Sequence, residues 1–331
     1  MKIQRSISLL IGAFLALCLA SCSPGLGNVF SGLDSVIIHK WCGRYVVQTP
    51  SHLQLWDAKE GEYKPTSITS AESLGLHNFA SERSVGYGDS IYCFTDDSLI
   101  AINIVTAQRQ VVSSMRVDKL LTDEATEDGE CVVSIKGVVY LVDLNVIRLT
   151  ELVACHGYVR AVITDSFVCL ADLNRVVVVL RSNPHAILSS LSPSGIKCMD
   201  ASDGLLIVGC DNRYVVYKLS TSAVEECLKV QLFEENESPI AVRVLSEESF
   251  LTYSRMGYRV CRLSAENGMY SYTKLASLYA VTDSPKAVYV SGATIGFVGC
   301  VDGVGSEWGI YEWDVSMQLL DLSENGLNSG G

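Results

Sequence analysis

The sequence lacks the motifs of common enzyme classes and the charge pattern of a nucleic-acid-binding protein. No G-x-S-x-G, H-E-x-x-H, P-loop or G-x-G-x-x-G pattern occurs, so the usual signatures of hydrolases, zinc proteases and nucleotide-binding proteins are absent. Lys and Arg number 25 against 37 Asp and Glu and never form a run, which disfavours nucleic acid and anionic lipid as partners. We therefore expect a protein without catalytic activity, metal or cofactor.

Long apolar runs are also missing, except at the N-terminus. Positions 7–19 are apolar apart from Ser8 and Gly12, and Lys2 and Arg5 precede them. A short positive segment followed by an apolar core of this length is typical of a cleaved export signal rather than of a membrane-spanning helix.

The leader ends in the sequence Leu-Ala-Ser-Cys at positions 19–22. This stretch resembles the lipobox of bacterial lipoproteins, in which small residues precede the cut and a thiol carries the lipid. The resemblance implies cleavage between Ser21 and Cys22 and thioether lipidation of Cys22, with palmitate among the expected acyl chains. An ordinary secretory signal with a cysteine at the cleavage site is the alternative. Ser23 rather than Asp follows, a pattern similar to outer-membrane sorting in enteric-type lipoproteins.

The sequence predicts four parts of the chain. We expect a signal peptide at 1–21, a lipidated cysteine with a Gly- and Ser-rich tether at 22–33, a folded domain at 34–322 and a flexible tail at 323–331. Removal of the leader takes away two basic residues, so the mature chain carries 23 basic and 37 acidic residues, a net charge of −14. A hydrophobic content of 48% indicates a substantial core.

Short runs of Val, Ile, Tyr and Leu, separated by Gly, Asp, Asn and Ser, fill the folded domain. No amphipathic helix is evident. Seven pairs of runs are joined by tight turns, and we expect each pair to form a β-hairpin. They lie at 44–58, 89–106, 130–145, 166–182, 204–220, 249–265 and 295–315.

The hairpins recur with a period close to 43 residues. Their second runs end at positions 57, 105, 143, 181, 219, 263 and 314, so the intervals are 48, 38, 38, 38, 44 and 51. Cys93, Cys131 and Cys169 are also 38 residues apart and act as a second marker. Repeats of about 40 to 45 residues with four strands are typical of β-propeller blades. We predict an all-β chain folded as a β-propeller, most simply with seven four-stranded blades. Six or eight blades, or two β-sandwiches, are the alternatives.

In such a ring the inner strands are covered on both faces by neighbouring blades and should read as continuous apolar runs. The runs at 176–180 and 205–208 have this character, whereas 109–117 has the polar character of an outer strand.

Several hairpins share a related sequence pattern in the second strand and in the turn after it. The pattern resembles the quinoprotein-type propeller repeat, in which an apolar strand ends in Ala-x-Asp/Asn before a turn and an outer strand. Trp-Asp pairs at 56–57 and 313–314 are similar to WD-type repeats. Only 101–103 keeps the Ala-x-Asn element, and the closing Trp of the family is absent. The clearest copies lie at 53–64, 99–112 and 138–152.

Lipid-anchored propellers of this type include the accessory lipoprotein of the outer-membrane β-barrel assembly machinery, a scaffold that holds no quinone. The resemblance implies a scaffold that binds other proteins of the bacterial cell envelope, with outer-membrane protein assembly as one such role. A surface-exposed ligand- or host-binding lipoprotein is the alternative, and a quinoprotein-type enzyme is less favoured. Protease shaving of intact cells would separate the first two, and cofactor absorbance would reveal the third.

Acidic residues gather just before the third hairpin, at Asp123, Glu124, Glu127 and Asp128. We interpret this segment as a possible interaction loop for a basic partner. A calcium site and an ordinary solvated turn are the alternatives.

The positions of the histidines and cysteines give little indication of a metal site or a catalytic site. None of the five histidines pairs with another at metal-ligand spacing, so each is expected in a turn or on the surface. Ten cysteines remain besides Cys18 and Cys22, and we expect most to be buried free thiols that fill core space. One or two disulfides are the alternative, since an exported protein can form them.

Overall fold

The computed structural model describes residues 37–41, 43–59, 62–77, 79, 83–154, 157–231, 239–254, 257–266, 269–278, 287–291, 294–299 and 309–314. The predicted signal peptide, the tether with Cys22, and the C-terminal tail lie outside these residues, as does the predicted cleavage site at Ser21. Within the described part of the chain, no helix is long and apolar enough to span a bilayer.

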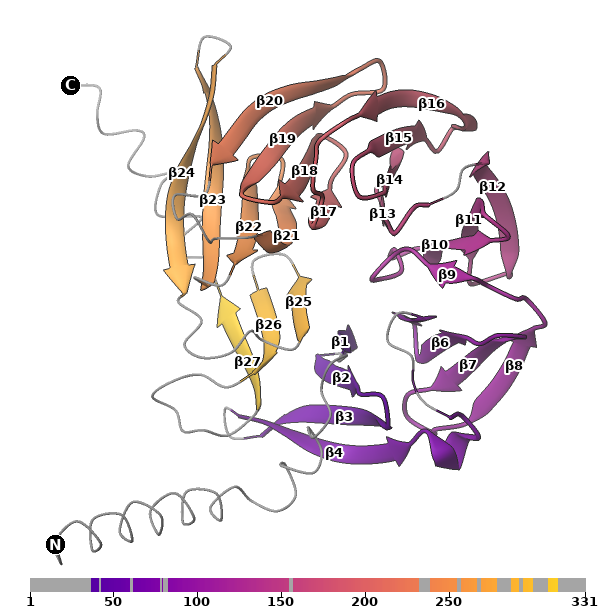
Figure 1. Ribbon diagram of the computed structural model, residues 1–331. Helices are drawn as coiled ribbons and strands as arrows, with labels where there is room; N and C mark the ends of the chain where they lie inside the picture. Colours follow the sequence, from indigo (N-terminus) through magenta and orange to yellow (C-terminus); the bar gives the residue numbers. More distant parts are fainter. Residues whose placement is uncertain are drawn as a thin grey trace, which may run out of the picture.

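The described residues form seven antiparallel sheets, six with four strands and one with three. Figure 1 shows the sheets arranged around a common centre in chain order, with first strands such as β1 (Ile37–Trp41) and β25 (Ala287–Ser291) innermost. The first two sheets contain β1 (Ile37–Trp41), β2 (Arg44–Gln48), β3 (His52–Lys59), β4 (Glu62–Ser70), β5 (Ser84–Tyr87), β6 (Ser90–Phe94), β7 (Leu99–Asn103) and β8 (Arg109–Ser113), with the 3-10 helix η1 (Glu72–Leu74) between them.

The third, fourth and fifth sheets contain β9 (Lys119–Leu120), β10 (Glu130–Ile135), β11 (Val138–Asp143), β12 (Arg148–Ala154), β13 (Arg160–Ile163), β14 (Phe167–Ala171), β15 (Val176–Leu180), β16 (Asn183–Leu191), β17 (Cys198–Ala201), β18 (Leu205–Cys210), β19 (Arg213–Leu219) and β20 (Val224–Gln231). The last two contain β21 (Pro239–Ser246), β22 (Ser249–Ser254), β23 (Gly257–Glu266), β24 (Met269–Leu278), β25 (Ala287–Ser291), β26 (Thr294–Gly299) and β27 (Gly309–Asp314).

The predicted all-β propeller fold is confirmed, and so are the seven hairpins. Each predicted pair forms the second and third strands of one sheet, from β2–β3 to β26–β27. Seven four-stranded blades remain a prediction, because a fourth strand for the last sheet would lie outside the described residues.

One backbone hydrogen bond recurs in five successive blades. It extends the ladder between the second and third strands by one step, and in every case its donor and acceptor are 15 residues apart. The bonds, 2.6–3.0 Å long, join the amides of Ile104, Leu144, Arg181, Leu219 and Leu263 to the carbonyls of Asp89, Gly129, Ser166, Gly204 and Glu248, respectively. These five hairpins therefore have the same length and the same register. In each of these blades, the turn after the first strand and the turn after the third strand lie at the same end.

This register corrects both periodicity markers. The equivalent amides, at positions 104, 144, 181, 219 and 263, are 40, 37, 38 and 44 residues apart, so of the three equal intervals of 38 between strand ends only the last, from 181 to 219, joins equivalent positions. Cys93 lies four residues after the acceptor residue of its blade, Cys131 two residues after and Cys169 three residues after. Cys93 and Cys131 therefore face the preceding blade, whereas Cys169 packs toward the following one. Their spacing of 38 residues is a coincidence and marks no equivalent position.

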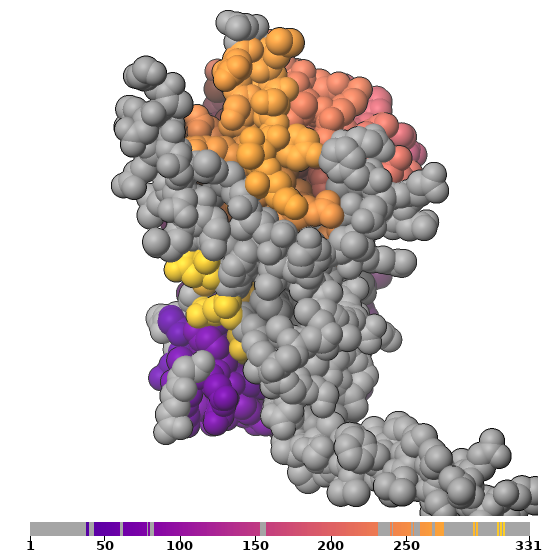
Figure 2. Space-filling model, turned by 90° about the vertical axis from the view of Figure 1, so that its left-hand side faces the viewer, coloured from indigo at the N-terminus to yellow at the C-terminus, as the bar shows by residue number. Residues whose placement is uncertain are grey.

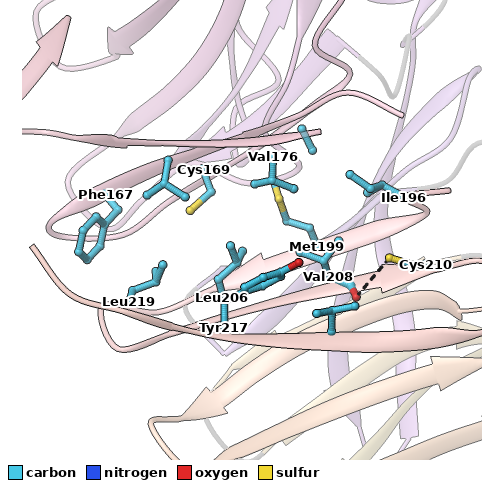
Figure 3. Packing of buried hydrophobic residues seen from close by; sticks show 13 residues of the cluster. Phe167, Cys169, Val176, Ile196, Met199, Leu206, Val208, Cys210, Tyr217 and Leu219 are labelled. Atoms are coloured by element: carbon cyan, nitrogen blue, oxygen red, sulfur yellow. Dashed lines mark hydrogen bonds between the residues drawn. The ribbon is translucent and has the colours of Figure 1, made fainter. Parts of the chain in front are cut away.

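The core lies between the blades rather than inside them. Five apolar clusters each fill the space between the facing sheets of two neighbouring blades. Figure 3 shows the cluster between the fourth and fifth blades, where Phe167, Cys169 and Val176 point toward Leu206 and Tyr217. The second to fifth sheets are thus covered on both faces, which a single blade could not achieve alone.

The expectation about inner strands needs a correction. The apolar runs at 176–180 and 205–208 are third and second strands, β15 and β18, in the middle of their blades. The innermost, first strands carry charge instead, with Arg160 in β13, Asp200 in β17 and Arg243 in β21. Among the described residues, the first strand of each blade has one edge with no neighbouring strand. Its polar side chains can therefore reach the solvent at the axis of the ring.

The first and last sheets meet through side chains. Within the described residues, no strand of the N-terminal sheet pairs with the C-terminal one. Tyr45 of β2 is fully buried, and its hydroxyl donates a 2.5 Å hydrogen bond to Oε1 of Glu312 in β27. The same hydroxyl occupies the space where a side chain on Gly296 of β26 would begin. Figure 2 shows the yellow C-terminal strands directly against the indigo N-terminal sheet.

His39 contradicts the expectation that every histidine is exposed or in a turn. It lies in β1 and is 7% exposed, with its ring against Gly86 of the second blade. Burial lowers the pKa of His39 from 6.5 to about 4, so its imidazole is neutral in the folded protein at neutral pH.

The burial of His39 predicts an acid-sensitive fold. The unfolded imidazole takes up a proton near pH 6.5 and the folded one near pH 4, so stability is lost as pH falls through this window. We expect a loss of about 3 kcal/mol between these limits. Urea unfolding at pH 7 and pH 4.5 measures it, and the His39→Asn variant should lose much less. Identical pH profiles for the two proteins would contradict the prediction.

Candidate functional site

A pocket of about 250 Å³ opens at the centre of the ring. Four consecutive blades line it, through the β9–β10 loop and the C-terminal ends of the innermost strands β13, β17 and β21. These strand ends lead into the turns that follow the first strand. The pocket therefore lies on the face that carries the turns after the first and third strands, called here the pocket face.

Charged side chains from three of these blades line the pocket, and Arg160 of the remaining blade pairs with one of them. Arg243 of β21 forms a 3.4 Å ion pair with Glu124 of the β9–β10 loop, from the third to the sixth blade. Arg160 of β13 pairs with Asp123 at 3.1 Å. Asp200 of β17 accepts a 2.7 Å hydrogen bond from the backbone amide of Val244. The pairs link blades far apart in the sequence and hold the pocket walls in place.

Burial shifts the pKa of two carboxyls in the pocket. It raises the pKa of Asp200 and of Glu124, while the charge of Arg243 opposes the shift in both. Burial also disfavours the charged form of Arg243, but the carboxylates of Asp200 and Glu124 more than offset this and raise its pKa. Arg243 thus stays charged and stabilises the carboxylates around it.

The predicted acidic loop divides into two halves. Asp123 and Glu124 enter the pocket, as an interaction site would require. Glu127 and Asp128 do not: both are exposed in the turn before β10, where the Asp128 carbonyl accepts a 2.7 Å hydrogen bond from the Asn145 side chain. The structure therefore brings together two of the four predicted residues and places the other two on the outside of the loop.

Sequence reasoning missed Arg160, Asp200 and Arg243. Arg243 did leave a signal, since it interrupts the apolar run Ile-Ala-Val-Arg-Val-Leu at 240–245. A charged residue inside such a run needs a partner if it is buried. No local pattern names that partner, because Glu124 is 119 residues away.

Two further features bear on chemistry. Among the described residues, no three His, Cys, Asp or Glu side chains are close enough to hold a metal ion. The seven described cysteines are free thiols. Six are buried, namely Cys93, Cys131, Cys169, Cys198, Cys210 and Cys261, and Cys227 is partly exposed.

Burial raises the pKa of five of these thiols to about 12, those of Cys93, Cys131, Cys169, Cys198 and Cys261. At pH 8 the thiolate fraction then falls from about one in ten to about one in 10⁴. We expect iodoacetamide to label Cys227 in the folded protein and to leave the five unlabelled until urea unfolds the chain. Peptide mapping by mass spectrometry measures this, and rapid native labelling of the five would contradict it.

No family model matches the chain, and no curated protein sequence does. Solved structures match at low identity. A structure of the mitotic checkpoint complex is 12% identical, with a TM-score of 0.57 over 89% of this chain and 92% of that one. The extracellular domain of a proposed hybrid two component system from B. thetaiotaomicron is 14% identical, with a TM-score of 0.57 over 85% of this chain and 38% of that one. At such identities the likeness concerns the fold alone, a β-propeller.

Proposed function

We propose that this chain is a lipid-anchored, non-catalytic scaffold that binds other proteins of the bacterial cell envelope. The observation that carries the proposal is a propeller preceded by a leader that ends in Leu-Ala-Ser-Cys. A propeller presents many turns on rigid strands, and such turn arrays suit protein recognition. The lipid anchor would place these turns beside membrane-associated partners.

The tether limits where the scaffold can act. Positions 22–33 are 12 residues, rich in Gly and Ser, with a root-mean-square end-to-end length of about 20 Å. The ring would therefore stay within a few tens of ångströms of the bilayer surface. Its mature charge of −14 favours protein partners over anionic headgroups. We place it at the outer membrane, where outer-membrane protein assembly is one task that such a scaffold serves.

The pocket face is the surface that we expect to bind partners. Two large aliphatic side chains project from turns on this face, Val105 at 60% exposure and Val146 at 66%. The turns belong to neighbouring blades and follow third strands. Single exposed apolar residues are common, but here two lie on the same face as a charged pocket, a combination typical of interaction surfaces.

Site-specific photo-crosslinking in growing cells tests the proposal. A benzophenone amino acid is placed at Val105 or Val146, and, as matched controls, at Leu173 in a turn on the opposite face and at Ile187 on an outer strand; all four are exposed aliphatic positions. We expect discrete crosslinked envelope proteins from the first two positions and few from the controls. Absence of discrete products at all four positions would refute the scaffold function.

A further inference from the structure

The central pocket presents carboxylates rather than guanidinium groups to solvent. The exposed fractions of the side chains are 58% for Asp123 and 40% for Glu124, against 33% for Arg160 and 23% for Arg243. Both arginines are thus less exposed and are engaged by ion pairs, whereas Asp123 and Glu124 are the more exposed partners. A molecule that enters the pocket meets negative charge first.

The charges in the pocket are also unequal in number. Three acidic residues line it, Asp123, Glu124 and Asp200, against one arginine, Arg243, and Arg160 pairs with Asp123 from the neighbouring strand position. Among the described residues, acidic groups therefore outnumber guanidinium groups at this site. Because Asp200 and Asp123 both disfavour the ionised form of Glu124, one additional cation beside Glu124 would relieve this repulsion.

Aliphatic residues form part of the walls between the charged groups. Val162 and Ile163 of β13, and Val244 and Leu245 of β21, line the pocket together with the acidic groups. Its volume of about 250 Å³ exceeds the roughly 30 Å³ that one water occupies in the liquid. A ligand that combines an apolar stem with a cationic end would match both parts of this lining.

We propose that the pocket binds a lysine or arginine side chain that a partner protein inserts at the centre of the ring. The aliphatic stem would pack against Val162, Ile163 and Val244, and the cationic end would bind Glu124 and Asp123 at the opening. This inference rests on the proposed scaffold function, and it specifies the chemistry by which the pocket face recognises its partner. The charge of the pocket opening makes an anionic anchor unfavourable at the same place.

Peptide binding to the mature lipidated chain in detergent tests the proposal. The probes are blocked pentapeptides with the sequence Gly-Gly-X-Gly-Gly, where X is Arg, Lys, norleucine or Glu, and binding is followed by ligand-observed NMR. We expect the Arg and Lys peptides to bind at about millimolar concentration and the Glu peptide to bind at least about tenfold more weakly. Equal binding of the Arg and Glu peptides would overturn the proposal, and so would equal binding of Arg and norleucine.

Variants locate the binding. Glu124→Gln and Asp123→Asn should each weaken Arg-peptide binding by about fivefold or more. Glu127→Gln and Asp128→Asn are matched controls, because they remove the same charges from the same loop outside the pocket, and they should stay within about twofold. Circular dichroism and thermal unfolding identify any variant that has lost its fold. A folded Glu124→Gln chain that binds the peptide as the natural chain does would refute the proposal.

Repeating the photo-crosslinking at Val146 with Glu124→Gln separates this inference from the proposed function. Crosslinks that weaken with Glu124→Gln but not with Glu127→Gln support the basic anchor. Crosslinks that are unchanged by Glu124→Gln would leave the proposed scaffold function standing and would overturn the proposed basic side-chain anchor. If no crosslink forms in the natural chain, the scaffold function itself fails.

Discussion

The Cys22→Ala protein is expected to leave the membrane fraction while its propeller remains folded. Without a thiol at this position no lipid can be attached, and each buried methylene of an acyl chain contributes about 0.8 kcal/mol to membrane binding. The structured strands begin at Ile37, 15 residues later, so the substitution touches no described contact. Fractionation after a high-salt wash, with circular dichroism of the released protein, measures both parts of the prediction.

Cys18→Ala is the matched control for the anchor, because it removes a cysteine from the leader and should leave the protein in the membrane fraction. Unprocessed Cys22→Ala precursor could be held by its apolar leader, so its size must be checked. A chain with positions 1–22 replaced by a cleavable secretory signal avoids that problem. If this chain still sedimented with membranes after the wash, the lipid anchor would be the wrong explanation.

The Tyr45→Ala protein is expected to lose about 3 to 5 kcal/mol of unfolding free energy. Tyr45 is completely buried where the first and last blades meet. Its ring packs edge-on against Tyr63, with ring centres 4.9 Å apart, and its hydroxyl bonds to Glu312. Truncation would leave a cavity at the contact that closes the ring, so both neighbouring blades lose packing together. Urea unfolding monitored by circular dichroism and fluorescence measures the loss.

Two other substitutions divide this effect into its parts. Tyr45→Phe keeps the ring and removes only the hydrogen bond, so it should cost about 1 to 2 kcal/mol. Tyr270→Ala removes the same side chain from the outer strand β24, where it is partly exposed, and should cost less than about 1 kcal/mol. A loss below about 1 kcal/mol for Tyr45→Ala would show that the ring does not depend on this contact.

The seven hairpins could be predicted because their causes are local. Short runs of Val, Ile, Tyr and Leu set the strands, and short Gly-, Asp- and Asn-rich turns join them. The residues of β18 and β19, for example, pair from Leu205 with Lys218 to Cys210 with Arg213, within one 14-residue segment. Local signals did not distinguish equivalent positions between blades, which is why the spacing of Cys93, Cys131 and Cys169 was misleading.

The pocket could not be predicted from the same kind of signal. Asp123 and Glu124 were identified because acidic residues cluster in their loop, but Glu127 and Asp128 belonged to the same cluster and lie outside the pocket. Which side of a loop faces the axis depends on how its blade packs against the next one. His39 follows the same rule, since the neighbouring blade buries it.

By itself, the sequence determined the seven hairpins and the propeller class, because each depends on residues close together in the chain, and it predicts the export leader with Cys22. Only the tertiary structure decided that Arg243 meets Glu124 at the axis and that Tyr45 meets Glu312 at the ring closure. Those contacts join residues 119 and 267 positions apart. They exist because the blades pack face to face in a ring, and no periodicity within one blade records that arrangement.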